Sequence, residues 1–187
     1  MGKEYHLKTP LSAGDIEPLR SGDRVIISGT IYTARDAAHR RIMELIEAEK
    51  ELPIPIEGQI IYYVGPSPAP PGRVIGAAGP TTSYRMDPFA PKLLELGLKG
   101  MIGKGKRSKE VIEAMVRFKG VYMAAIGGAG ALMARAIKTA RVVAYDELGP
   151  EAIRELRVEN LPAIVVNDTL GNDLYVEGQE KYRILDA

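Results

Sequence analysis

The sequence predicts an α/β domain with a mostly parallel central sheet, and three observations support this. Short apolar runs alternate with amphipathic segments of helical periodicity between residues 25 and 145, a rhythm typical of parallel strands joined by crossover helices. The 187 residues have the length of one domain, and we see no linker that divides them. With 45% hydrophobic and 26% charged residues, the composition is that of an ordinary globular protein. We therefore expect a single domain over residues 1–187.

The first elements are predicted from capping patterns and apolar periodicity. Ser12 with Asp15 resembles a capping box and predicts a short helix toward Leu19, and the run at 25–27 predicts a buried strand. Thr33 with Asp36 forms a second such pattern, before a helix that ends near residue 50. The apolar stripe of that helix consists of Ala38, Ile42, Leu45 and Ile46.

Proline, glycine and β-branched residues delimit the remaining elements. Residues 59–64 predict a strand, and the proline-rich residues 65–72 predict a stiff loop. The elements expected next are a strand from Val74, a turn at 79–82, a helix over 88–96 closed by Gly97, a strand at 101–102 and a turn at 103–105. They are followed by a helix capped by Ser108, a strand at 121–126, a glycine-rich turn at 127–130 into a helix to about Lys138, a strand at 141–145, and two strands at 163–167 and 174–177 joined at Gly171 and Asn172.

Composition excludes several functional classes. The sequence contains no cysteine and only two histidines, His6 and His39, so we expect no metal site made by this chain alone. A formal net charge of +1 does not provide the basic excess of a nucleic-acid-binding protein. No apolar run reaches the roughly 18 residues of a transmembrane helix, and the N-terminus lacks the apolar core of a secretory signal. We therefore expect a cytoplasmic protein without nucleic-acid or membrane partners.

Three loops carry polar groups suited to binding an anion. Arg35 stands in the first turn of a predicted helix, where the helix dipole favours acidic residues, so it suggests a partner anion. Thr81, Thr82 and Arg85 follow a predicted strand, and Lys104 follows another. Because the carboxyl ends of parallel strands share one edge of a sheet, we expect a cationic, hydroxyl-rich half-site for a small dicarboxylate or phosphate.

Each of these patterns also has a plainer interpretation. The segment at 33–41 can be a capped helix with solvated arginines, and Thr81 or Thr82 can simply cap a turn. Residues 100–107 resemble a Walker A loop, but Arg107 stands where the Mg²⁺-binding Ser or Thr belongs. The glycines at 127–130 fall short of a dinucleotide fingerprint and either pack closely or form a wall of the site.

Several motifs together resemble a known enzyme family. They are LKTPL at 7–11, GD at 22–23, SGTI at 28–31, TARDAAH at 33–39, GPTT at 79–82 with Arg85 and Met86, MIGKG at 101–105, and GGAGAL at 127–132. In this order and spacing they resemble the β subunit of class I, iron–sulfur-dependent fumarate hydratases and L-tartrate dehydratases. The resemblance covers nearly the whole chain and implies a swivelling β/β/α domain.

The resemblance also implies a reaction and a partner. It implies reversible hydration of fumarate to L-malate, or dehydration of tartrate to oxaloacetate. A separate α subunit would hold a 4Fe-4S cluster through three cysteines, and the iron would act as a Lewis acid on the hydroxyl group. The absence of cysteine here agrees with the β half, which would be active only with the α subunit. The isolated chain is expected to form a homo-oligomer through the surface meant for its partner.

Roles are assigned by matching motifs. Arg35, Arg85 and Lys104 would bind substrate carboxylates, and Thr82 would line the pocket. Thr81 would abstract the proton, with Arg35 among the cations that stabilise the resulting alkoxide. His39 and Asp36 would support the arginine loop from behind. The open alternatives are a tartrate dehydratase β subunit, a non-catalytic anion-binding module of the same fold, and a nucleotide-binding protein.

Overall fold

A single mixed sheet organises the computed structural model, which describes residues 2–125 and 128–183. The strand order is β1-β2-β3-β4-β5-β7-β6, and β2 also pairs with β7. The strands are β1 (Glu4–Lys8), β2 (Arg24–Thr33), β3 (Ile60–Tyr62), β4 (Gly100–Gly103), β5 (Val121–Ala124), β6 (Ile137–Ala144) and β7 (Ile153–Asn167).

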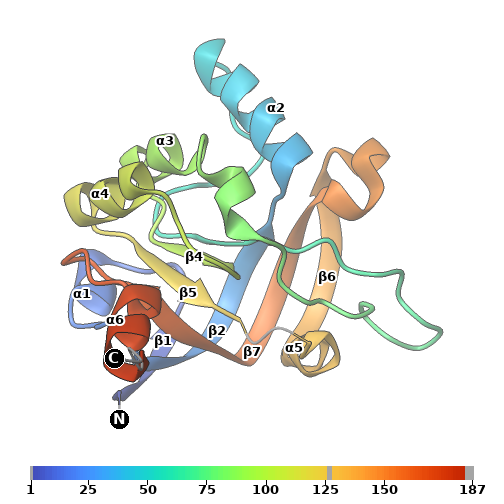
Figure 1. Ribbon diagram of the computed structural model, residues 1–187. Coiled ribbons are helices and arrows are strands. Elements are labelled where there is room, and N and C mark those ends of the chain that lie inside the picture. The colour runs from blue at the N-terminus through green and yellow to red at the C-terminus, as the bar shows by residue number, and fades with distance from the viewer. Residues whose placement is uncertain (1, 126–127, 184–187) are drawn as a thin grey trace.

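The sheet is parallel from β1 to β5, as the sequence predicts. The long strand β7 runs antiparallel to β2, β5 and β6. Because β7 pairs with both β5 and β2, the pairings β2-β3-β4-β5-β7 return to β2 and form a closed ring of strands (Figure 1).

Helices connect and cover these strands. They are α1 (Ala13–Ile16), α2 (Asp36–Glu47), α3 (Ala90–Glu95), α4 (Lys109–Phe118), α5 (Gly130–Ala136) and α6 (Leu174–Tyr182), with short 3₁₀ helices η1 (Ser83–Met86) and η2 (Asp146–Glu151). In Figure 1, α2, α3 and α4 lie together on one side of the strands, and the loop between β3 and η1 extends away from them.

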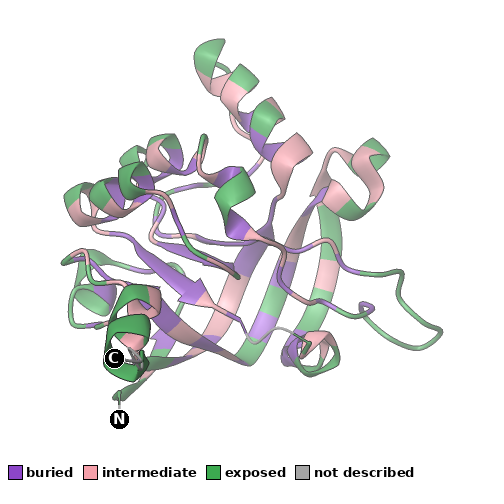
Figure 2. Cartoon of the chain, viewed as in Figure 1, coloured by how far each residue is buried: buried purple, intermediate pink, exposed green. Residues whose placement is uncertain are grey.

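The strands separate two apolar clusters. Successive side chains of a strand point to opposite faces, so Ile60 and Tyr62 of β3 join one cluster while Ile61 joins the other. The first cluster packs within the ring of strands, and the second includes Ile42 of α2 and Leu93 of α3. In Figure 2 the strand β5 is largely buried, whereas β6 is mostly exposed or half-buried, and the outer faces of the helices are exposed.

Most of the predicted elements are confirmed. The predicted strands at 25–27, 59–64, 101–102, 141–145 and 163–167 all overlap observed strands, as does 121–126, although residue 126 lies outside the described residues. The capping box of Ser12 and Asp15 is present, and Ser108 Oγ accepts a hydrogen bond from Val111 N–H. Gly97 has a φ of 95° where the helix over 88–96 is expected to end.

The predicted cap at Thr33 is wrong. Thr33 is the last residue of β2, and its hydroxyl group donates to Ala152 O and accepts from Arg154 N–H. The residue that precedes α2 is Arg35, whose side chain makes no capping hydrogen bond. The Thr33 hydroxyl group is thus already hydrogen-bonded to Ala152 and Arg154, so it does not cap α2.

Three further predictions are corrected. No strand begins at Val74, which is 49% exposed in the loop, where Gly76 packs against the backbone of Ser67 and Pro68. The helix expected to reach Lys138 ends at Ala136, and β6 begins at Ile137. The strand predicted at 174–177 is the start of α6, because Asp173 accepts from Tyr175 N–H and caps a helix there.

Candidate functional site

The loops that follow β2, β3 and β4 meet at one edge of the sheet. Arg35 lies two residues beyond the end of β2, residues 63–65 follow β3, and Lys104 follows β4. Since these strands are parallel neighbours, their carboxyl ends lie side by side. The common edge expected for Arg35 and Lys104 is therefore confirmed by the pairing.

The segment that carries Thr81 and Thr82 lies between two of these loops. Thr81 N–H donates to Tyr63 O at 2.7 Å, and Lys104 N–H donates to Thr81 O at 3.2 Å. Ser83 N–H then donates to Lys104 O at 2.9 Å, and Thr82 forms a parallel bridge with Lys104. The threonine pair is thus held between the end of β3 and Lys104, with both threonines only partly buried.

The Arg35 side chain contacts the segment that follows β3. A Cβ atom at Gly65 would overlap with the Arg35 guanidinium, so the missing side chain of Gly65 makes room for it. Arg35 Nη2 lies 3.4 Å from Glu151 Oε1. Arg35 Nε is buried and has no hydrogen-bond partner within the described residues. A buried donor without a partner is costly, which makes it a candidate contact for an anion.

Arg85 is held close to Arg35 through Asp36. Arg85 Nη2 lies 2.9 Å from Asp36 Oδ2, so the η1 loop and the first turn of α2 are joined by an ion pair. The Arg85 side chain is 39% exposed and that of Asp36 is 16% exposed. The loops that carry Arg35, Thr81, Thr82, Arg85 and Lys104 are therefore brought together at one edge of the sheet.

His39 is buried beneath Arg35. The ring stacks on Phe89 and meets Tyr63 edge-on, with both centroid separations at 5.6 Å. Burial lowers the pKa of His39 from 6.5 to about 4, so the ring is neutral at neutral pH. Because a carbonyl oxygen only accepts, Nδ1 must donate to Arg35 O at 2.8 Å. His39 therefore holds the backbone of Arg35.

Arg107 occupies the position that the Walker A interpretation assigns to a Mg²⁺ ligand, and its surroundings do not support that interpretation. The side chain is fully buried, with Nε donating to Asp87 Oδ1 at 2.7 Å. Its guanidinium lies over the rings of Tyr63 and Tyr122, at 5.4 and 4.9 Å from their centroids. Helix α4 begins only at Lys109, whereas a P-loop lysine opens its helix.

The glycine-rich turn packs against the threonine loop. Ala78 N–H donates to Gly130 O at 3.0 Å, and a Cβ atom at Gly130 would lie 3.1 Å from Gly79 N. The close-packing interpretation is therefore confirmed for Gly130. It does not hold for Gly128, where an added Cβ atom would meet nothing within 4 Å, and Gly127 lies outside the described residues.

Sequence reasoning missed four residues that support this edge. Glu151 pairs with Arg35 and accepts from Ala37 N–H at 3.0 Å. Asp87 pairs with Arg107, and Ser83 and Tyr122 share a hydrogen bond of 2.9 Å. Ser83 stands within the segment already singled out and Asp87 directly follows it, but Glu151 and Tyr122 are distant in sequence and carry no motif.

The residues of this chain do not fit an iron–sulfur cluster. The sequence has no cysteine, and no group of three His, Asp or Glu side chains within the described residues could hold a metal ion. Cluster iron needs thiolate ligands of the kind that cysteine supplies. Separately, none of the described helices combines the length and apolarity needed to span a membrane.

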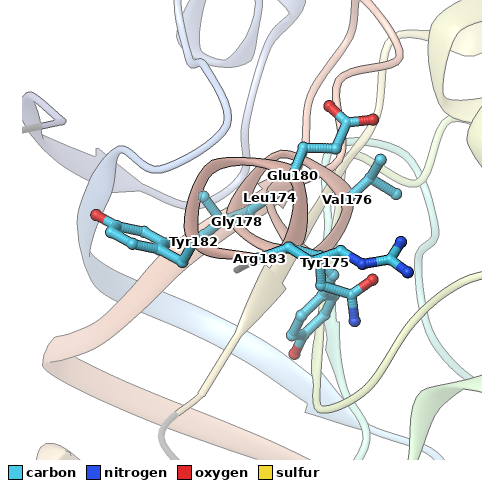
Figure 3. A pocket seen from close by; sticks show the side chains of 8 residues that line it. Leu174, Tyr175, Val176, Gly178, Glu180, Tyr182 and Arg183 are labelled. Atoms are coloured by element: carbon cyan, nitrogen blue, oxygen red, sulfur yellow. The ribbon is translucent and has the colours of Figure 1, made fainter. Parts of the chain in front are cut away.

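A hollow of about 920 Å³ lies along α6, next to the Lys104 loop but without the predicted site residues. It is lined in part by Leu174, Tyr175, Val176 and Tyr182 (Figure 3). Tyr175 connects it to the site edge, because its hydroxyl oxygen accepts a hydrogen bond from Gly105 N–H at 3.3 Å.

Comparison with known proteins gives a consistent result. The family model described as "Fumarase C-terminus" matches residues 2–178. The chain is 44% identical to "Fumarate hydratase class I, anaerobic" of Escherichia coli over 81% of its length, and 42% identical to "Fumarate hydratase 1, mitochondrial" of Leishmania major over 84%. It spans only 28% and 29% of those two proteins. It is 39% identical to "Putative L(+)-tartrate dehydratase subunit beta" of Methanocaldococcus jannaschii over 91% of both chains.

Proposed function

Because this chain belongs to the family of the fumarase C-terminus, we propose that it is the β part of a class I hydro-lyase that interconverts fumarate and L-malate. One observation carries the proposal most directly. Thr81 is hydrogen-bonded between the end of β3 and Lys104, while Arg35 packs against Gly65 at that same strand end. A threonine whose backbone is held between loops that carry cations suits a substrate with two carboxylates.

The proposed binding groups are Arg35, Arg85 and Lys104. Arg35 offers a buried Nε without a partner in the described chain, and Arg85 is already oriented by Asp36. Guanidinium groups match the planar fork of a carboxylate, and an ammonium group acts as a point charge. Thr82 lies beside Lys104 and lines the same edge.

The proposed proton acceptor is Thr81. Dehydration of L-malate removes a proton from the carbon next to one carboxylate and releases the hydroxyl group from the other central carbon. An unperturbed threonine hydroxyl is far too weak an acid to be ionised at neutral pH, so the neighbouring cations must stabilise the alkoxide in a site closed from water. His39 contributes no charge, since it is neutral, and acts by holding the Arg35 backbone.

The site requires a partner in this proposal. Thr81 and Thr82 are half-buried and Arg85 and Lys104 are exposed in the chain alone, so a second surface is needed to exclude water. We assign that surface to a cysteine-bearing α subunit, which would also hold the 4Fe-4S cluster that this chain cannot ligate. We also propose that the domain itself has the swivelling β/β/α fold, and the mixed sheet with helices packed on it supports this.

Reconstitution with a cluster-loaded α subunit tests the function. We expect hydration of fumarate by the wild-type complex, its loss in Thr81→Ala, and partial retention in Thr81→Ser, which keeps the hydroxyl group. Thr139→Ala is the matched control, because Thr139 is an exposed threonine on β6. A complex that forms but neither hydrates fumarate nor dehydrates tartrate would refute the proposed enzymatic function. That result would favour a non-catalytic anion-binding module.

L-Tartrate dehydration is the second candidate reaction. It is favoured by the similarity to the Methanocaldococcus jannaschii chain, which extends over 91% of both sequences. The same complex assayed with L-tartrate distinguishes the two, since the preferred substrate is the one with the higher kcat/KM.

A further inference from the structure

The hydroxyl group of Tyr122, a residue of β5, joins two loops of the proposed site. It lies 2.9 Å from Ser83 Oγ and 3.0 Å from Gly105 O. A carbonyl oxygen only accepts, so the single proton of the tyrosine hydroxyl goes to Gly105. Ser83 must therefore donate to Tyr122, and the two bonds form a chain from Ser83 through Tyr122 to Gly105.

The backbone on both sides is shaped for this link. A Cβ atom at Gly103 would overlap with Ser83 Oγ, so the glycine allows Ser83 to approach. Gly105 has a φ of 84°, a conformation that favours glycine. Its carbonyl group binds Tyr122 and its N–H group binds Tyr175 Oη. Both polar backbone groups of Gly105 are thus held by tyrosine hydroxyls.

The Tyr122 ring is itself fixed. It is buried, and the Arg107 guanidinium lies over it at 4.9 Å from the centroid. Arg107 is anchored in turn by Asp87 at 2.7 Å. A buried hydroxyl group cannot exchange its partners for water without cost, so the link is maintained as long as this packing persists.

We infer that Tyr122 is a positioning residue that keeps the threonine segment and Lys104 in register. Ser83 follows directly after Thr82, and Gly105 follows directly after Lys104. The bridge therefore closes the backbone ladder in which Lys104 bonds both Thr81 O and Ser83 N–H. This inference rests on the proposed function, because the register matters to catalysis only if Thr81 and Lys104 act on one substrate.

The test is Tyr122→Phe in the reconstituted complex, with hydrogen exchange of the loop amides. We expect kcat to fall roughly 10- to 100-fold, the scale of an ångström-sized misplacement. We expect KM to change less, because Arg35 and Arg85 are held by other contacts. The Ser83 and Lys104 amides should exchange faster, while those of α2 should not. Ser83→Ala removes only one end of the bridge and provides a second test if Tyr122→Phe does not fold.

Tyr145→Phe is the matched control. The Tyr145 ring also lies beneath a guanidinium, that of Arg41, at 5.1 Å from the centroid, and its buried hydroxyl group has no hydrogen-bond partner in the described part of the chain. Tyr145 directly precedes η2 and is not among the loops of the proposed site. The substitution should leave kcat near the wild-type value. The double variant Tyr122→Phe with Ser83→Ala should be no slower than Tyr122→Phe alone, because both changes break one chain of bonds.

The outcomes separate the inference from the function. An active wild-type complex whose kcat is unchanged by Tyr122→Phe, or a double variant whose losses multiply, would overturn the positioning role alone. An inactive wild-type complex would overturn the proposed function. The register between the threonine segment and Lys104 would then have no role in catalysis. In that case faster exchange at Ser83 in Tyr122→Phe would still establish the cross-link.

Discussion

The Nδ1 atom of His39 donates a hydrogen bond to the carbonyl oxygen of Arg35 at 2.8 Å. The same carbonyl accepts the His39 backbone N–H at 2.9 Å, so both bonds fix the turn that presents the arginine. Nε2 is buried and has no hydrogen-bond partner within the described residues. Protonation at that nitrogen would place a charge in a buried position where no described residue accepts a hydrogen bond from it.

This burial predicts a specific pH dependence of stability. The pKa of His39 is about 4 in the folded chain against 6.5 ordinarily, so the unfolded chain binds a proton that the folded chain refuses. The stability that the neutral, buried His39 ring contributes is fully present above pH 6.5 and is lost as the pH falls to about 4. The loss amounts to about 3 kcal/mol of unfolding free energy.

Urea unfolding across this range measures the effect. The difference between wild type and His39→Gln should be larger above pH 6.5 than near pH 4. His6→Gln controls for the loss of a histidine, because His6 is 74% exposed. A difference that does not change with pH would contradict the assignment of a buried neutral ring.

Removal of Asp87 should destabilise the fold strongly. Asp87 binds Arg107 Nε and also accepts from Ser108 N–H at 2.7 Å, at the start of α4. Because Asp87→Ala leaves a buried guanidinium without its counter-charge, we expect a loss of about 3–5 kcal/mol of unfolding free energy. The exposed pair of Lys92 and Glu95 has a similar length of 2.8 Å, and Glu95→Ala should cost far less unfolding free energy, because water screens an exposed ion pair. Equal losses of unfolding free energy in Asp87→Ala and Glu95→Ala would contradict a large stabilising role for the buried pair of Asp87 and Arg107.

Gly103→Ala should disturb the site edge through overpacking. The new Cβ atom would overlap with Ser83 Oγ, and we expect a loss of about 1–3 kcal/mol by urea unfolding. Gly178→Ala is the control, since nothing lies within 4 Å of its added Cβ atom in α6. That substitution should stabilise the chain by up to about 1 kcal/mol. A tolerated Gly103→Ala would mean that Ser83 does not need its present position.

The sequence was sufficient for the parts of the fold governed by local signals. Helix α2 followed from the stripe of Ala38 and Ile42, and the Ser108 cap from its position before an apolar helix. The common edge of Arg35 and Lys104 followed from the parallel order of strands.

Long-range pairing explains the parts that could not be predicted. Most of β7 was not predicted. Its extended conformation depends on pairing with β2 and β6, and its own alternating polar residues are a weak signal for a strand. The strand predicted at 174–177 became α6 because Asp173 caps it, a signal weaker in the sequence than its β-branched and aromatic residues. Glu151 and Tyr122 reach the site from distant strands and turns, and no local pattern marks them.

Steady-state kinetics of Lys104→Met in the reconstituted complex would test the central claim most directly. If three loops form one site for a dicarboxylate, loss of this charge should lower kcat/KM by roughly 10- to 150-fold, the range for a charged hydrogen bond of about 1.5–3 kcal/mol. Lys109→Met, which removes an exposed lysine in α4, should leave kcat/KM close to the wild-type value. Equal kcat/KM values for the two variants would contradict the account.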